Sequence, residues 1–187
     1  MVEQLDREEL LKQIESVAWE CERDVHGCGR CALRTLMQYL NLGDKDDIDM
    51  FQKAILALSG GIAQERETCG AILGGIMAIG LAYFPGKIED ATVWDMMAVM
   101  QLIRKYYRAV EKEVGHVRCW DIREVGLGRC YDTADPEEYQ KFLDAGGHEL
   151  CAGVAGKAAR IAAEFILELR ENPATPAPPA GEKGTAS

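Results

Sequence analysis

Hydrophobic residues recur every three or four positions along most of the chain, which is the spacing of one face of an α-helix. Leu10, Leu11 and Ile14 begin such a stripe, and glycine or proline interrupts the pattern between segments. The pattern predicts helices at residues 6–21, 30–42, 47–60, 69–84, 91–114, 135–146 and 151–169, with an irregular segment at 116–133. No run alternates with the period of two expected of a β-strand. We therefore expect an all-α fold, a compact single-domain helical bundle of about six to seven helices.

The end of the chain has a different composition from the rest. From Asn172 onward it is rich in proline, alanine, glycine and small polar residues, which cannot bury a hydrophobic core. We expect a helical, cysteine-rich domain over residues 1–171 and a disordered Pro/Ala/Gly-rich tail over 172–187.

The chain is acidic, with a formal net charge of −10 and a pI of about 4.8. This balance argues against nucleic acid as the main partner, because phosphate binding requires a basic surface. Residues 1–6 lack the basic and apolar regions of a secretory signal. The longest apolar run, residues 71–84, is shorter than the roughly 20 residues that a bilayer requires. The sequence thus predicts a soluble cytoplasmic protein that binds neither nucleic acid nor membranes.

Seven cysteines are present, an odd number that fits poorly with a complete disulfide framework. In a reducing compartment, many cysteines indicate metal binding or redox chemistry. Cys31, Cys69 and Cys151 lie at or near the starts of predicted helices, and Cys119 is grouped with them near the start of the irregular segment. At a helix start the helix dipole favours a thiolate. Four converging thiolates suit an iron–sulfur cluster (2Fe-2S or 4Fe-4S) or tetrahedral zinc. These four cysteines are the predicted ligands, with Cys28 as an additional candidate.

Cys69 marks the change from a short charged segment to the most hydrophobic predicted helix. Thr68 is the expected N-cap, which places Cys69 in the first turn. Gly70, Gly74 and Ala78 follow at intervals of four, so one helix face has almost no side chains. Such a face suits either the close packing of a second helix or the approach of a bulky inorganic group.

Cys28 and Cys31 form a Cys-x-x-Cys pair that fits two ligands or a redox dithiol. The pattern lacks the βαβ context of a thioredoxin and the following histidine of a haem attachment site. His26, His116 and His148 each precede a cysteine by two or three residues. They are either cluster ligands, hydrogen-bond donors that tune the sulfurs, or ordinary polar residues of the loops before helices.

The segment Glu67–Gly74 reads Glu-Thr-Cys-Gly-Ala-Ile-Leu-Gly. It resembles the central motif of the redox-active proteins named for a C…GCAxxG…C…C cysteine pattern. Cys31, Cys119 and Cys151 resemble the other cysteines of that pattern, and the resemblance covers residues 28–169. It implies a small helical redox protein. A similar domain in split-Soret cytochromes is associated with a non-haem iron–sulfur centre, so the resemblance also implies such a centre here.

The chain departs from these relatives in two respects. It has no Cys-x-x-Cys-His sequence, so the resemblance implies no haem. It also contains Cys21, Cys28 and Cys130 in addition to the four cysteines of the pattern, which leaves the ligand set open.

Three functions fit these observations. The first is a redox protein in which Cys31, Cys69, Cys119 and Cys151 hold an iron–sulfur cluster and exchange electrons with a redox partner protein, or sense redox state. The second is a cofactor-free thiol–disulfide oxidoreductase in which Cys69 or Cys31 attacks the substrate. The third is an interaction module with structural zinc. An exposed glycine face or a shared cluster would also permit a homodimer.

Overall fold

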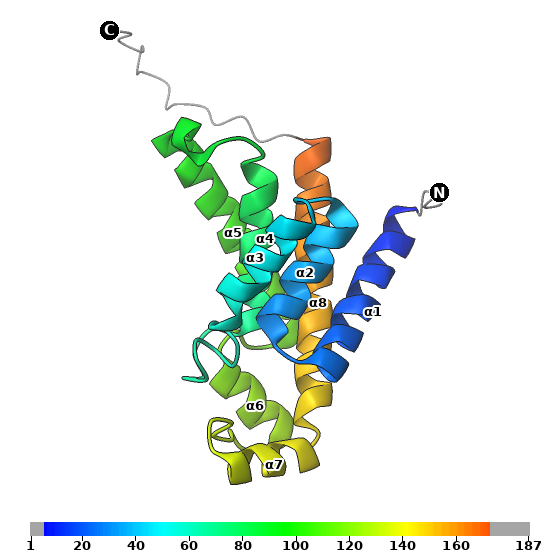
Figure 1. Cartoon of the computed structure of the whole chain (residues 1–187), viewed down its shortest axis with the longest axis vertical. Coiled ribbons are helices and arrows are strands. Elements are labelled where there is room, and N and C mark those ends of the chain that lie inside the picture. Colours follow the sequence, from blue (N-terminus) through cyan, green and yellow to red (C-terminus); the bar gives the residue numbers. More distant parts are fainter. Residues whose placement is uncertain (1–5, 173–187) are drawn as a thin grey trace, which may run out of the picture.

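The computed structural model describes residues 6–172 (Figure 1). That part forms eight α-helices and one 3₁₀ helix: α1 (Arg7–Val25), α2 (Cys28–Leu40), α3 (Lys45–Leu56), α4 (Gly70–Tyr83), η1 (Ile88–Asp90), α5 (Val93–Val114), α6 (Cys119–Leu127), α7 (Pro136–Asp144) and α8 (Gly147–Glu171). The all-α prediction is confirmed, although residues 6–172 contain eight α-helices where six to seven were expected. The irregular segment predicted at 116–133 is wrong in part, because it contains α6. Apart from Asn172, the predicted tail lies outside the described residues.

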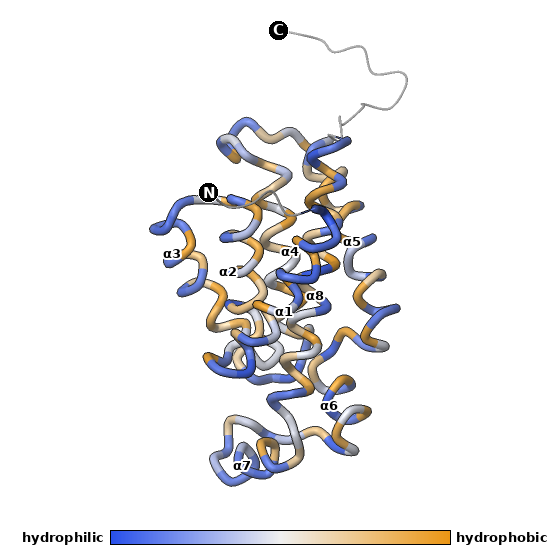
Figure 2. Tube along the Cα trace, turned by 90° about the vertical axis from the view of Figure 1, so that its right-hand side faces the viewer, coloured by the Kyte–Doolittle hydropathy of each residue, from blue (hydrophilic) through white to orange (hydrophobic). Residues whose placement is uncertain are grey.

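The long C-terminal helix α8 is the centre of the bundle. Helices α1, α2, α4 and α5 pack along it, and α6 and α7 lie at its N-terminal end, at the bottom of Figure 1. Alanines on α8 are fully buried, which lets the neighbouring helices approach closely: Ala155, Ala158, Ala159, Ala162 and Ala163. Hydrophobic and hydrophilic positions alternate along α1 and α5 in Figure 2, as expected of amphipathic helices at a surface. Among residues 6–172, no helix has both the length and the hydrophobicity needed to cross a membrane.

Helices α2 and α4 pack with their backbones in contact. A Cβ atom added to Gly74 would lie 2.6 Å from the carbonyl oxygen of Gly29, and one added to Gly70 would lie 2.8 Å from the Sγ atom of Cys28. The small-residue face of α4 is therefore filled by α2. This packing brings the first turn of α2 against the first turn of α4.

The start of α4 differs from the prediction. Cys69, and not Thr68, is the N-cap residue of this helix. Thr68 instead forms an isolated antiparallel bridge with Arg118, and the Cys69 N–H donates to the carbonyl of Val117 at 2.9 Å. The physical reason is that backbone pairing with the segment before α6 keeps Thr68 extended and outside the helix.

Helices α2 and α8 both begin earlier than predicted. Gly27 has a φ of 98°, which ends the connection from α1 and lets α2 start at Cys28. Gly146 has a φ of 80°, and α8 starts immediately after it at Gly147, so that Cys151 lies in the second turn and does not open the helix.

The connection between α3 and α4 contains a left-handed turn. Residues 60–64 all have φ between 49° and 75°, although three of them are not glycine. A branched residue such as Ile62 is costly in this region of backbone space. Backbone hydrogen bonds hold the turn, including one of 2.8 Å from the Ala63 N–H to the Ala57 carbonyl. The turn places Gly60 and Gln64 beside the cavity described next.

Candidate functional site

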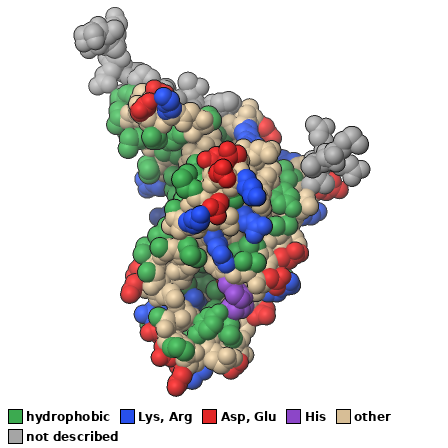
Figure 3. All heavy atoms as spheres, viewed as in Figure 1, with side chains coloured by type: hydrophobic (Ala, Val, Ile, Leu, Met, Phe, Trp, Pro, Cys, Tyr) green, Lys and Arg blue, Asp and Glu red, His purple; other side chains and the backbone are tan. Residues whose placement is uncertain are grey.

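Four cysteines line one cavity of about 310 Å³ near the N-terminal end of α8. Cys28, Cys69, Cys119 and Cys151 come from α2, the N-cap of α4, α6 and α8. The first three are buried and Cys151 is partly buried. On the face shown in Figure 3, a histidine lies at the edge of a hollow in the lower part of the molecule. The fold thus brings thiols from four separate helical segments into one place.

Three of these thiols lie at helix N-termini. Cys28 and Cys119 are the first residues of α2 and α6, and Cys69 is the N-cap of α4. Backbone N–H groups in the first turn of a helix have no partner within the helix, and the helix dipole is positive at that end. The cavity therefore has a lining that stabilises negative charge on sulfur.

Backbone hydrogen bonds join the cysteine-bearing ends of α4 and α6. The Cys69 N–H donates to the Val117 carbonyl at 2.9 Å, and the Cys119 N–H donates to the Glu67 carbonyl at 2.7 Å. Arg118 adds an ion pair with the Glu67 carboxylate, with 3.4 Å between nitrogen and oxygen. The positions of Cys69 and Cys119 relative to each other are thus fixed by the main chain.

The thiols of Cys28 and Cys69 lie next to each other. The contact with the Cys69 thiol lowers the pKa of Cys28 to about 6, with help from the backbone N–H groups of Gly60 and Ala71, and this outweighs the effect of burial. The same contact, together with burial, raises the pKa of Cys69. The two thiols therefore titrate as a pair, in which the proton on one sulfur stabilises negative charge on the other.

Arg123 supplies a buried positive charge beside the other two thiols. Burial raises the pKa of Cys119 to about 11 and also raises the pKa of Cys151, and the Arg123 guanidinium opposes both shifts. Arg123 donates to the Thr133 hydroxyl at 3.1 Å and lies 4.6 Å from the centre of the Phe142 ring. Within residues 6–172, its Nε atom has no hydrogen-bond partner. Its free donor and charge are suited to stabilise thiolates.

Two imidazoles and a carboxyl group complete the polar lining. The rings of His26 and His148 have their centroids 3.9 Å apart and their planes tilted by 33°, and His148 Nε2 lies 3.1 Å from the Tyr139 hydroxyl. Burial is the main effect that lowers the pKa of His148, and the neighbouring His26 lowers it further. Burial is the main effect that raises the pKa of Glu22 to about 9, and the nearby cysteine sulfurs contribute to the same shift. At neutral pH the Glu22 carboxyl thus retains its proton beside the thiols.

The buried Glu22 predicts a pH dependence of stability. The folded protein retains this proton up to about pH 9, whereas the unfolded chain releases it near 4.5, so the unfolded chain binds fewer protons between these values. The free energy of unfolding should consequently decrease as the pH rises through this window. We expect Glu22→Gln to remove that decrease in urea unfolding of the metal-free protein. A Glu20→Gln variant, changed at an exposed position of the same helix, should keep it. Equal slopes in the two variants would contradict the prediction.

The cavity contains three of the four predicted ligands, Cys69, Cys119 and Cys151. Its fourth thiol is Cys28, the additional candidate. Cys31 is fully buried elsewhere, in contact with Cys21 between α1 and α2. The difference follows from the start of α2, because the first thiol of the helix is Cys28, and Cys31 lies one turn further along.

The structure also places the three histidines at two different sites. His26 and His148 line the cavity with the cysteines, whereas His116 lies at a different hollow. Cys130 is partly buried, and its thiol donates to the Tyr131 carbonyl at 3.9 Å.

Glu22 and Arg123 line the cavity although the sequence did not single them out. Glu22 continues the buried stripe of α1, which also contains Ile14 and Ala18. In the sequence, the signal for Glu22 was therefore a charged residue at a position where the helical pattern expects an apolar one. Arg123 follows Cys119 by one helical turn, a signal visible only once α6 is known to be a helix.

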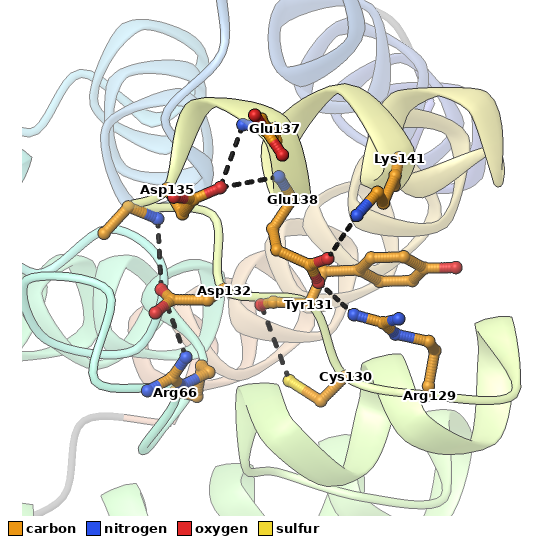
Figure 4. Close-up of polar contacts among 10 residues, drawn as sticks. Arg66, Arg129, Cys130, Tyr131, Asp132, Asp135, Glu137, Glu138 and Lys141 are labelled. Carbon is orange, nitrogen blue, oxygen red and sulfur yellow. Dashed lines mark hydrogen bonds and ion pairs between the residues drawn. The ribbon is translucent and has the colours of Figure 1, made fainter.

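Polar contacts hold the loop between α6 and α7 (Figure 4). The Arg66 guanidinium lies 3.2 Å from the Asp132 carboxylate, which connects this loop to the segment before α4. Asp135 caps α7 by accepting hydrogen bonds from two backbone N–H groups. Because Thr133 belongs to this loop and binds Arg123, the network also positions the buried guanidinium.

The four cysteine thiols that line the cavity are a donor set that could hold a soft metal ion or an iron–sulfur cluster. Among residues 6–172, no three histidine, cysteine, aspartate or glutamate side chains are grouped closely enough to hold one ion. A cluster of several irons separates its thiolate ligands more widely than a single ion does, and the four thiols that line the cavity could hold one. Burial and a neighbouring positive charge are further features through which proteins adjust such clusters.

Comparison with known proteins identifies one related family. The family model described as "Putative redox-active protein (C_GCAxxG_C_C)" matches residues 27–165. The match covers well over half of the chain and includes all four cavity cysteines, whereas Cys21 precedes it. No curated protein and no solved structure shows a match to this chain.

Proposed function

This chain belongs to the C_GCAxxG_C_C family of redox-active proteins, and we propose that its cavity holds an iron–sulfur cluster on Cys28, Cys69, Cys119 and Cys151. The supporting observation is the convergence of these four thiols, from four helical segments, on one buried cavity. The proposed ligand set contains Cys28 where the sequence alone predicted Cys31. The proposed role is electron transfer or redox sensing.

The chain contributes several features to such a site. A bound cluster supplies one-electron oxidation and reduction. The backbone N–H groups of Gly60 and Ala71 stabilise the Cys28 thiolate, and Arg123 places a positive charge near Cys119 and Cys151. This charge favours the more negative, reduced state of the site. The surrounding burial limits access of water and oxygen.

Such a protein would exchange electrons with a redox partner protein in the cytoplasm. The net charge of −10 suits a partner with a basic surface, since complementary charge accelerates association. A homodimer, which the sequence permits, stays a prediction, although the glycine face of α4 packs against α2.

Purification in the absence of oxygen tests this function. We expect a brown protein whose visible absorption bleaches on reduction, with iron and acid-labile sulfide in matching amounts. Zinc in a colourless protein would favour the structural module. A colourless protein that takes up no iron on reconstitution with iron and sulfide would contradict the cluster.

The contact between Cys28 and Cys69 favours a second candidate function, a cofactor-free thiol–disulfide oxidoreductase. The sequence-based version of this hypothesis named Cys69 and Cys31, but Cys69 contacts Cys28. In this reaction Cys28 would attack a substrate disulfide and Cys69 would resolve the mixed disulfide. Metal-free protein that reduces a small disulfide, with the activity lost in Cys69→Ser, would favour this function over the cluster.

A further inference from the structure

A second pair of thiols lies outside the cavity, where α1 and α2 meet. Cys21 is in the last two turns of α1, and Cys31 is one turn into α2. Their side chains lie next to each other, and both are free thiols. Neither belongs to the lining of the four-cysteine cavity.

The two members of this pair have different surroundings. Cys31 is fully buried, and its thiol lies 3.9 Å from the His26 carbonyl. Cys21 is only partly buried and has the guanidinium groups of Arg34 and Arg30 nearby. Because Cys21 is reachable from solvent and lies near positive charge, it is suited to be the attacking thiol. The buried Cys31 is placed to act second.

The charges agree with this division of roles. The hydrogen bond from Cys31 and the arginines outweigh burial and lower the pKa of Cys21 to about 7. The hydrogen bond to Cys21, burial and the Cys21 charge raise the pKa of Cys31. The surroundings thus favour negative charge at the accessible sulfur over negative charge at the buried one.

We propose that Cys21 and Cys31 form a separate dithiol centre that reduces disulfide substrates and is itself converted to a Cys21–Cys31 disulfide. The inference goes beyond the proposed cluster and does not require it. Cys21 lies before the matched residues 27–165, so the centre is a feature of this chain in addition to the family pattern.

The reaction takes place in two exchange steps. The Cys21 thiolate attacks one sulfur of a substrate R–S–S–R, forms the mixed disulfide Cys21–S–S–R and releases R–S⁻. Cys31 then loses its proton to water or to the released thiolate and attacks the Cys21 sulfur, which releases the second R–S⁻. The substrate gains two electrons and becomes two thiols, and the two cysteines lose two electrons.

The first step prepares the second. While Cys21 is a thiolate, its hydrogen bond and its charge hold the proton on Cys31. Formation of the mixed disulfide removes that negative charge and so lowers the pKa of Cys31. Cys31 therefore becomes a nucleophile only after the substrate is bound covalently to Cys21.

Peptide mapping of the full chain tests this centre. The anaerobically purified protein is treated with glutathione disulfide, blocked with N-ethylmaleimide, unfolded and digested with trypsin. Arginines at 23, 30 and 34 place Cys21, Cys28 and Cys31 in three different peptides, 13–23, 24–30 and 31–34. We expect peptide 13–23 to be disulfide-linked to peptide 31–34. A link between 24–30 and 31–34, or the absence of a disulfide on 31–34, would overturn the proposal.

Two single variants assign the roles. Cys31→Ser should accumulate one glutathione on peptide 13–23, because the resolving thiol is missing. Cys21→Ser should leave Cys31 unmodified, because the buried thiol has no accessible partner. Cys130→Ser, changed at another partly buried cysteine, should retain the 13–23 to 31–34 link. Glutathione on Cys31 in the Cys21→Ser variant, with the helical circular dichroism unchanged, would refute the order of attack. Iron content of Cys21→Ser is expected to equal that of the unmodified chain, which separates this centre from the cluster.

Discussion

Replacing Cys28 by serine is expected to lower iron binding by more than about tenfold, whereas replacing Cys31 leaves it unchanged. Cys28 lines the cavity with Cys69, Cys119 and Cys151, and Cys31 contacts Cys21 instead. A serine hydroxyl is a poor ligand for iron in a thiolate site, so loss of one ligand should prevent stable assembly. The measurement is iron and acid-labile sulfide per chain after anaerobic reconstitution of each variant.

The two variants are matched controls for each other. Both cysteines are buried in the first turns of α2, so general destabilisation would affect both variants. The reverse result, with iron retained in Cys28→Ser and lost in Cys31→Ser, would contradict the ligand set proposed from the cavity. Circular dichroism of both proteins distinguishes a lost ligand from a lost fold.

Gly74→Ala is expected to destabilise the protein by about 3 kcal/mol. The added Cβ would lie 2.6 Å from the Gly29 carbonyl oxygen and 3.1 Å from the Leu33 backbone nitrogen. Both contacts are with backbone atoms, so no side-chain rotation can relieve them and α2 must move away from α4. The melting temperature of the metal-free protein should fall by about 6 to 12 °C.

Gly80→Ala provides the control on the same helix. In the part of the chain that the structure describes, nothing lies within 4 Å of the Cβ that this substitution adds. Alanine has the higher helix propensity, so this variant should gain up to about 1 kcal/mol. Equal melting temperatures for the two variants would mean that α2 and α4 are not in backbone contact.

The fold was largely predictable because apolar spacing alone identifies amphipathic helices. Helix α6 was the exception, since its nine residues begin with Cys119 and Trp120 and include Gly126, which interrupts the helical pattern. Its N-terminus depends on backbone pairing between residues 66–69 and 117–120, which is a tertiary contact. Such contacts are not visible in local periodicity.

The candidate site was predictable in kind but not in detail. Cysteines at helix starts indicated the chemistry, and Cys69 was identified from its position before the apolar helix. The choice between Cys28 and Cys31 depended on where α2 begins, which Gly27 decides through its positive φ. The contribution of Arg123 depended on α6, which had not been predicted.

The antiparallel bridge between Thr68 and Arg118 would affect the speed of electron exchange at the proposed centre. Exchange is slow when the ligands of a redox centre must move as its charge changes, a cost called the reorganisation energy. The Cys69 and Cys119 N–H groups each donate to a carbonyl of the opposite segment, so neither cysteine can shift along the backbone without moving the other. Preorganised groups of this kind contribute little to that cost. A centre held by these two cysteines would therefore exchange electrons with a low reorganisation energy.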